Sequence, residues 1–262
     1  MNKDISKIKC FMLDMDGTFY LGDQLFPGAL EFMDYLQDKH LDYLFLTNNS
    51  SKHAGNYAEK IRGMGFDVDE SKIFTSGEAT TIYLRKETAY RKIYLVGTEA
   101  LENEFASAGF DITEKNPDAV VLGFDTTLTY ERIWKICDFI RDGKPYIATH
   151  PDFNCPTESG FMPDIGSFIA MIEASTGRRP DVIIGKPYSH IVNAVVEKTG
   201  FKLDEIAMIG DRLYTDIALG EAGIMTILVL SGETKLEDLD GSEFKPDMVV
   251  ENLGELLEKI SY

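Results

Sequence analysis

The chain is poor in cysteine, in basic residues and in long apolar runs, and each shortage argues against a class of protein. It has 3 cysteines, Cys10, Cys137 and Cys155. An odd, widely spaced set predicts neither a disulfide framework nor a metal site and favours a reducing compartment. Lys and Arg total 26 against 44 Asp and Glu, a net charge of −18. A nucleic-acid binder normally presents a basic face, so we expect no nucleic-acid partner.

No apolar run approaches the ~18 residues that would suggest a membrane-spanning helix. Residues 1–10 mix charged residues with isolated apolar ones and do not resemble a signal peptide. We therefore expect a cytoplasmic protein with no membrane partner.

Short apolar runs alternate with segments of helical period along almost the whole chain, a pattern that predicts an α/β fold with a parallel sheet. The 262 residues leave room for a second domain. Residues 80–179 begin the alternation afresh, with enough strands and helices for a small domain of their own. We predict a Rossmann-like core formed by residues 1–79 and 180–262, with residues 80–179 inserted as an α/β domain.

Two local features of this pattern carry further expectations. Trp134 lies inside the helical pattern of residues 130–141, so we expect it in the core. Ser50 or Ser51 is expected to cap a helix that ends near Gly63.

Four apolar runs, each interpreted as a buried strand, are followed by polar residues. The runs span residues 8–13, 41–46, 182–184 and 206–209, and they lead to Asp14-Met15-Asp16-Gly17-Thr18, Thr47-Asn48-Asn49, Gly185-Lys186-Pro187, and Gly210-Asp211 with Asp216. Open parallel sheets bind ligands at the carboxyl ends of their strands. The four polar groups are therefore expected to share one crevice.

The first polar segment has the groups that phosphoryl transfer requires. Asp14, at the end of its strand, is the expected nucleophile, which would form an aspartyl-phosphate intermediate. Asp16 points to the same side of an extended chain and is expected to protonate the leaving group and then to activate water. Gly17 permits a tight turn, and Thr18 is expected to hold the loop by a hydrogen bond.

Two carboxylates beside a phosphate dianion require a cation, and Mg²⁺ suits oxygen ligands. Asp14 and Asp211 are the expected carboxylate ligands, with the backbone carbonyl of Asp16 as a third. Asp216 is expected either to bind through water or to fix the neighbouring groups from outside the metal's own ligands.

The remaining polar residues are candidates for contact with the substrate. The Thr47 hydroxyl is expected to donate to a phosphoryl oxygen, and Lys186 to offset the developing negative charge. Asn48 and Asn49 follow Thr47 directly and are further candidates. His150, on a loop of the inserted domain, is a weaker candidate, since function gathers on loops.

These segments, taken in order, resemble the four motifs of the haloacid dehalogenase superfamily. The string Gly210-Asp211-Arg212-Leu213-Tyr214-Thr215-Asp216, together with Leu46-Thr47-Asn48-Asn49-Ser50, is similar to its NagD and p-nitrophenyl phosphatase subgroup. The resemblance covers essentially the whole chain and implies a C2-type cap domain, Mg²⁺ dependence and the aspartyl-phosphate route. Asp16 distinguishes the chain from the dehalogenases, which lack this second aspartate. Dimerisation through the cap is common in such relatives, so a homodimer is a further expectation.

The function expected is a Mg²⁺-dependent phosphatase of small phosphomonoesters such as sugar phosphates, nucleoside monophosphates or p-nitrophenyl phosphate. One alternative is a phospho-aspartate receiver of the signalling type, although receivers are about half this length and place their acidic pair elsewhere. Another is a phosphotransferase or mutase with the same nucleophile. Mutase relatives insert their cap between the first two motifs, where this chain has only about thirty residues, between Asp16 and Thr47.

Overall fold

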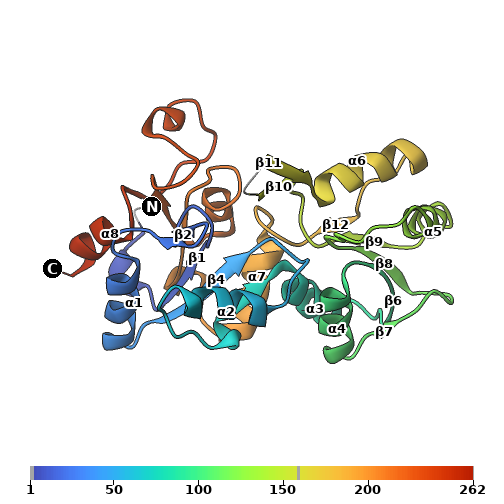
Figure 1. Cartoon of the computed structure of the whole chain (residues 1–262), viewed down its shortest axis with the longest axis horizontal. Helices are drawn as coiled ribbons and strands as arrows, with labels where there is room; N and C mark the ends of the chain where they lie inside the picture. The colour runs from blue at the N-terminus through green and yellow to red at the C-terminus, as the bar shows by residue number, and fades with distance from the viewer. Residues whose placement is uncertain (1–2, 158–159, 262) are drawn as a thin grey trace. The chain divides into compact units, whose positions relative to one another are not determined.

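The structure is a computed structural model that describes residues 3–157 and 160–261. It divides into two compact units, shown in Figure 1. The core unit comprises Met1–Thr47, Ala54–Phe74 and Val195–Tyr262, and the second unit comprises Asn48–His53 and Thr75–Ala194. Residues 180–194, which the sequence led us to expect in the core, therefore lie in the second unit. Among the described residues, no helix is long and apolar enough to cross a membrane.

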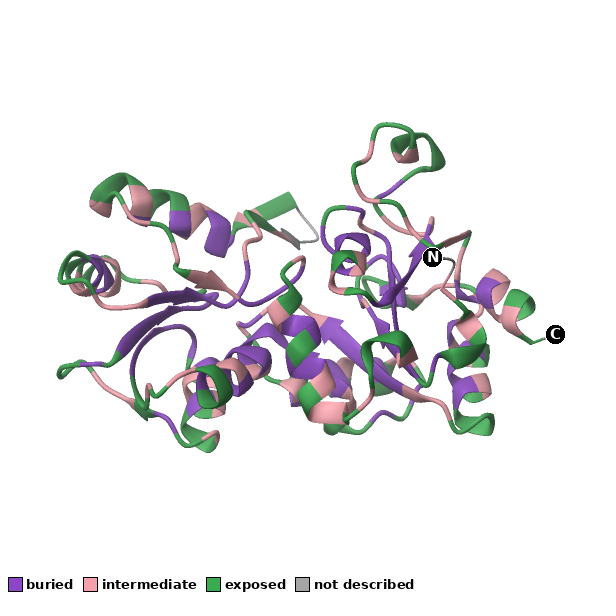
Figure 2. Ribbon diagram, turned by 180° about the vertical axis from the view of Figure 1, so that it is seen from behind, coloured by how far each residue is buried: buried purple, intermediate pink, exposed green. Residues whose placement is uncertain are grey.

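The core unit is built on a six-stranded sheet. Its strand order is β15 (Met248–Val250), β14 (Met225–Val229), β13 (Ile206–Gly210), β1 (Cys10–Leu13), β4 (Asp42–Thr47) and β5 (Ile73–Thr75). The pairings from β15 to β4 are all parallel. The central strands β1, β13 and β14 are buried along their whole length, as Figure 2 shows in purple. Unbroken apolar runs of this kind are typical of parallel strands that are covered on both faces, so the Rossmann-like parallel core is confirmed.

Helices α1 (Ala29–Asp38), α2 (Ala54–Gly63) and α8 (Leu253–Ile260) contribute to one apolar core with this sheet. Phe32 and Leu36 of α1 lie about one helical turn apart and are both fully buried. They pack in the same cluster as Phe11 and Leu13 of β1, which alternate onto one face of the sheet. This packing leaves the carboxyl ends of β1, β4 and β13 to carry polar groups.

The second unit has a separate five-stranded sheet. Its order is β12 (Val182–Ile183), β9 (Tyr146–Ala148), β8 (Ala119–Leu122), β6 (Lys92–Val96) and β7 (Asp111–Ile112), all parallel. Its α-helices are α3 (Ser76–Glu87), α4 (Glu99–Ser107), α5 (Tyr130–Arg141) and α6 (Ile165–Thr176), and α7 (Ser189–Thr199) begins in this unit. Helices α5 and α6 form one apolar cluster with the sheet. The second unit thus has an α/β core of its own.

Strand β12 corrects the sequence interpretation. The run of residues 182–184 was expected in the core sheet, but Val182 pairs with Ile147 and Ile183 with Ala148 in the second sheet. Asp181 reinforces this edge, since its Oδ2 accepts the backbone N–H of Tyr146 at 2.7 Å. A run of two or three apolar residues does not specify which of two parallel sheets it joins.

Several short elements complete the fold. They are the antiparallel pairs β2 (Tyr20–Leu21) with β3 (Gln24–Leu25) and β10 (Asn154–Thr157) with β11 (Gly160–Pro163), and the 3-10 turns η1 (Ile5–Lys7), η2 (Glu70–Lys72), η3 (Leu203–Glu205), η4 (Ile217–Ala222) and η5 (Leu236–Leu239). The two antiparallel pairs were not predicted.

Two local expectations were wrong. Trp134 is 61% exposed, because α5 turns Ile136, Cys137 and Ile140 inward and Trp134 falls outside that face. Helix α2 begins at Ala54, so neither Ser50 nor Ser51 caps it.

Candidate active site

The loop after β1 is shaped by its backbone. The N–H groups of Phe19 and Tyr20 both donate to Met15 O, at 2.9 and 3.1 Å, and Gly17 N donates to Tyr20 O at 2.9 Å. Gly17 has φ +95°, and a Cβ there would also overlap the Asp211 carboxylate. Glycine is needed on both grounds. The loop therefore places Asp14 and its neighbours directly against the segment after β13.

Thr18 departs from its expected role. Its Oγ1 is buried and makes no hydrogen bond with any residue that the structure describes. The expected hydrogen bond from Thr18 is therefore wrong. The loop is held instead by its backbone bonds and by Ser231, whose Oγ donates to Gly17 O at 2.8 Å.

Three carboxylates converge where β1 and β13 end. Asp14, Asp211 and Asp216 each offer an oxygen, and these oxygens all lie within 4.8 Å of one another. Parallel pairing of β1 with β13 explains the arrangement, because Leu13 and Ile209 are in register and each precedes its polar segment. An all-oxygen set of this kind fits a hard divalent cation such as Mg²⁺. The carboxylate of Asp16 is not part of the cluster.

Asp211 and Asp216 are held by main-chain donors. Asp211 Oδ2 accepts the N–H of Glu233 at 2.7 Å, and Asp216 Oδ2 accepts the N–H of Arg212 at 3.1 Å. Each carboxylate thus has a fixed orientation. Asp216 fixes the loop after β13 while one of its oxygens lies within 4.8 Å of those of Asp14 and Asp211.

Arg212 is a charged neighbour that the sequence interpretation did not single out. Its Nε lies 3.0 Å from Glu233 Oε2, and Tyr214 Oη donates to Glu233 Oε1 at 2.8 Å. Burial acts to lower the pKa of Arg212, but the charges of Asp14 first, and then the surrounding Tyr214, Asp211 and Glu233, raise it above its ordinary value. The guanidinium therefore stays charged beside the proposed nucleophile. Its position directly after Asp211 was the one signal available in the sequence.

Asp16 lies in a different setting from Asp14. Its side chain is 60% exposed, with Lys60 Nζ 3.9 Å from its Oδ1 and Tyr20 Oη 3.5 Å from its Oδ2. Burial, and then the nearby Asp16 charge, raise the pKa of Tyr20, so the phenol stays a hydrogen-bond donor. Lys60 also sits 3.9 Å from the centre of the Tyr20 ring. Thr47 ends β4, the neighbour of β1, and so belongs to the same edge of the core sheet.

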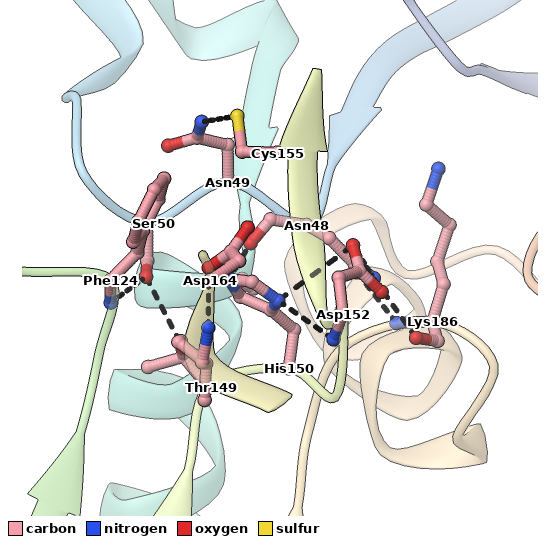
Figure 3. Close-up of polar contacts among 12 residues, drawn as sticks. Asn48, Asn49, Ser50, Phe124, Thr149, His150, Asp152, Cys155, Asp164 and Lys186 are labelled. Carbon is pink, nitrogen blue, oxygen red and sulfur yellow. Dashed lines mark hydrogen bonds and ion pairs between the residues drawn. The ribbon is translucent and has the colours of Figure 1, made fainter. Parts of the chain in front are cut away.

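In the second unit, Asn48 binds the main chain of Lys186 through both ends of its amide (Figure 3). Lys186 N donates to Asn48 Oδ1 at 2.7 Å, and Asn48 Nδ2 donates to Lys186 O at 2.9 Å. Nδ2 also lies 3.1 Å from both carboxylate oxygens of Asp152. The two amide hydrogens are thereby used within the protein. These bonds hold the Asn48 side chain against the Lys186 main chain, and its expected contact with substrate stays a prediction.

His150 is fully buried, not solvated on a loop. Its Nδ1 accepts the backbone N–H of Asp152 at 3.4 Å, and its Nε2 lies 3.5 Å from Asp164 Oδ1. Burial raises the pKa of Asp164 to about 6, against the opposing effects of His150 and of the Ile165 N–H. These contacts tie His150 to its neighbours within the second unit, and its contact with a substrate stays a prediction.

Asn49 is also occupied within the second unit. Its Oδ1 accepts from both the N–H and the hydroxyl of Ser51 at 2.8 Å, and its Nδ2 lies 3.8 Å from Cys155 Sγ. Ser50, which was expected as a helix cap, contacts the Thr149 hydroxyl at 3.0 Å and accepts the Phe124 N–H at 2.9 Å. The Asn48–Asn49–Ser50 segment is thus bound into the second unit residue by residue.

Comparison with known proteins agrees with this geometry. Residues 11–111 match the family model described as haloacid dehalogenase-like hydrolase, and residues 183–256 match a HAD-hydrolase-like model. The chain belongs to the haloacid dehalogenase-like hydrolases. NagD of Escherichia coli K12, a ribonucleotide monophosphatase, is 37% identical over 95% of this chain and 98% of its own. An acid sugar phosphatase of Staphylococcus epidermidis is 35% identical over 91% of this chain and 92% of its own.

A solved structure extends the similarity to three dimensions. The 4-nitrophenylphosphatase of Thermotoga maritima superposes with a TM-score of 0.93 at 54% identity, covering 97% of this chain and 98% of that one. Within its family, the chain is a HAD-type phosphatase of the NagD-like group. The recognition of this family from four short motifs is confirmed.

Proposed function

We propose that this HAD-type phosphatase hydrolyses small phosphomonoesters in a Mg²⁺-dependent reaction that passes through an aspartyl phosphate on Asp14. The observation that carries the proposal is the convergence of Asp14, Asp211 and Asp216, with Asp16 two residues beyond the nucleophile. Sugar phosphates, nucleoside monophosphates and p-nitrophenyl phosphate are the proposed substrates. The names of the relatives, which include a sugar phosphatase, a ribonucleotide monophosphatase and a 4-nitrophenylphosphatase, support this range.

The carboxylates of Asp14, Asp211 and Asp216 fit a hard cation, and the backbone carbonyl of Asp16 is the further ligand we propose. When bound, Mg²⁺ would neutralise phosphoryl charge that the carboxylates alone would repel. The Asp211 carboxylate has little room to move, because the Gly17 backbone lies against it and the Glu233 N–H donates to its Oδ2. These residues therefore offer a compact, oriented oxygen set.

The protein's own groups would divide the reaction between them. Asp14 attacks phosphorus and forms the new P–O bond, while the bond to the leaving alkoxide breaks and Asp16 supplies its proton. Asp16 then takes a proton from the water that attacks the aspartyl phosphate, which restores Asp14 and releases inorganic phosphate. The exposure of Asp16 supports this role, because an exposed carboxyl is open first to the leaving group and then to the attacking water.

Thr47 and Lys186 are proposed to bind the phosphoryl oxygens, the first by its hydroxyl and the second by its charge. The intact motif positions support this assignment. The homodimer through the cap and the cytoplasmic location stay predictions.

The test is a panel of phosphomonoesters incubated with the enzyme and Mg²⁺, with released phosphate as the readout. We expect turnover of p-nitrophenyl phosphate and of at least one sugar phosphate or nucleoside monophosphate, and its loss on addition of EDTA with recovery on excess Mg²⁺. Phosphate release that EDTA leaves unchanged would refute the metal dependence. A chain that releases no phosphate from any member would refute the substrate class.

A further inference from the structure

We propose that Asp152, supported by the buried His150–Asp164 pair, is a positioning residue for Lys186. It would act through Asn48, whose side-chain amide is hydrogen-bonded to both the N–H and the carbonyl of Lys186. This inference rests on the proposed function, in which Lys186 is the cation that binds the phosphoryl group. All five residues lie in the second unit, so the geometry that carries it is internal to that unit.

The contact between Asn48 and Lys186 is specific in its orientation. The Asn48 carbonyl faces the Lys186 N–H and its amino group faces the Lys186 carbonyl, so a rotated amide would lose both bonds. Ser76 Oγ donates to Asn48 O and holds the asparagine's own backbone. Lys186 is only 3% exposed, so its main chain has little freedom once this frame is made.

Asp152 determines the orientation of the Asn48 amide. One amide hydrogen is committed to Lys186 O, and the other faces both oxygens of Asp152 at 3.1 Å (Figure 3). A carboxylate accepts hydrogen bonds only, so it selects the amino end of the amide and excludes the flipped form.

His150 and Asp164 extend this set of contacts beyond Asp152. The backbone N–H of Asp152 donates to His150 Nδ1, and His150 Nε2 lies 3.5 Å from Asp164 Oδ1. Asp164 is itself fixed by the Ile165 N–H at 2.7 Å, at the start of α6. The imidazole of His150, which lies between the carboxylates of Asp152 and Asp164, thus connects α6 to the residue that orients Asn48.

The residue directly before Lys186 has room only for glycine. A Cβ on Gly185 would lie 2.6 Å from Asn48 Oδ1 and 2.7 Å from the Cβ of His150. Gly185 N donates to Thr149 O at 2.8 Å, so the strand end that carries His150 also carries the lysine loop. Asp152 and Lys186 are therefore parts of one framework.

The test replaces Asp152 with alanine and measures two independent quantities. These are amide hydrogen exchange at Lys186 by NMR, and kcat and KM for p-nitrophenyl phosphate with Mg²⁺. We expect exchange about tenfold faster and kcat lowered about tenfold, with a smaller change in KM, because a displaced lysine would cost charge stabilisation in the transition state. Asp152→Asn retains an acceptor for the Asn48 amide and is expected to restore most of both values.

Asp118→Ala is the matched control. Asp118 also accepts two hydrogen bonds in the second unit, from the backbone N–H groups of Arg91 and Lys92, and its loss is expected to change neither quantity. If Asp152→Ala does not fold, Asp152→Leu keeps a branched side chain without an acceptor and takes its place.

Unchanged exchange at Lys186 in the folded variant would overturn the positioning role. Faster exchange with unaltered kcat would overturn its connection to catalysis. If the wild-type chain turns over no phosphomonoester, the proposed function fails, and the exchange measurement still decides whether Asp152 positions Lys186.

Discussion

Asp164 is a buried carboxyl whose ionisation costs stability, and replacing it with asparagine should remove that cost. The residue is 3% exposed, and burial raises its pKa from 3.8 to about 6 in the folded protein. Between these two values the native state holds a proton that the unfolded state has released. The free energy of unfolding therefore falls as the pH rises through this window. Asparagine keeps an oxygen that can accept the Ile165 N–H but never ionises.

The size of the effect follows from the shift. Integrated over the titration, the ionisation of Asp164 costs about 2 kcal/mol at pH 5 and about 3 kcal/mol at pH 8. The free energy of unfolding of Asp164→Asn relative to wild type should therefore improve by about 1 kcal/mol between pH 5 and pH 8. Any constant difference in packing between the two side chains cancels in this comparison.

Urea unfolding at the two pH values measures this quantity. Trp134 is the single tryptophan and lies in α5 of the same unit, so its fluorescence reports on that unit. Asp118→Asn is the control, because hydrogen bonds from Arg91 and Lys92 lower the pKa of Asp118. The stabilisation that ionised Asp118 provides is already complete above pH 5. The difference in unfolding free energy between Asp118→Asn and wild type should therefore be the same at pH 5 and pH 8. A difference for Asp164→Asn that also stays constant would refute the raised pKa.

Three further predictions concern the core unit. Asp14→Asn should lower hydrolysis of p-nitrophenyl phosphate by about a thousandfold or more with no loss of fold, and a variant that keeps substantial turnover would contradict the nucleophile assignment. Asp16→Ala should lose about a hundredfold or more with alkyl phosphates and much less with p-nitrophenyl phosphate, whose leaving group needs little protonation; equal losses would contradict the general acid. Gly17→Ala should destabilise the protein by roughly 1–3 kcal/mol, because φ is +95° there and the new Cβ would meet Asp211. The same variant should weaken Mg²⁺ binding in calorimetry, and unaltered binding would show that the glycine does not confine Asp211.

The carboxylate cluster could be predicted because it depends on short-range information. Asp14 and Asp211 each follow a strongly apolar run, and parallel neighbours deliver such residues to one edge. Asp216 follows Asp211 closely enough for a single turn to bring its carboxylate back toward Asp211. The hydrogen bond from the Arg212 N–H to Asp216 Oδ2 holds this turn.

The framework around Lys186 could not be predicted in the same way. Asn48 and Asp152 are 104 residues apart in sequence, and Asn48 and Lys186 are 138 apart. Nothing in either neighbourhood marks the other as its partner. Asn48 was therefore interpreted as a substrate contact, and His150 likewise, although the folded chain encloses both side chains.

What the sequence by itself determined was the α/β class and, through four short motifs, the phosphatase family, because periodicity and strand-end chemistry are local properties. Only the tertiary structure decided that β12 joins the second sheet, that Trp134 faces solvent, and that Asn48 holds Lys186. Each of these outcomes depends on which distant surface a short segment packs against. That choice is made by the total burial and hydrogen bonding of the folded chain.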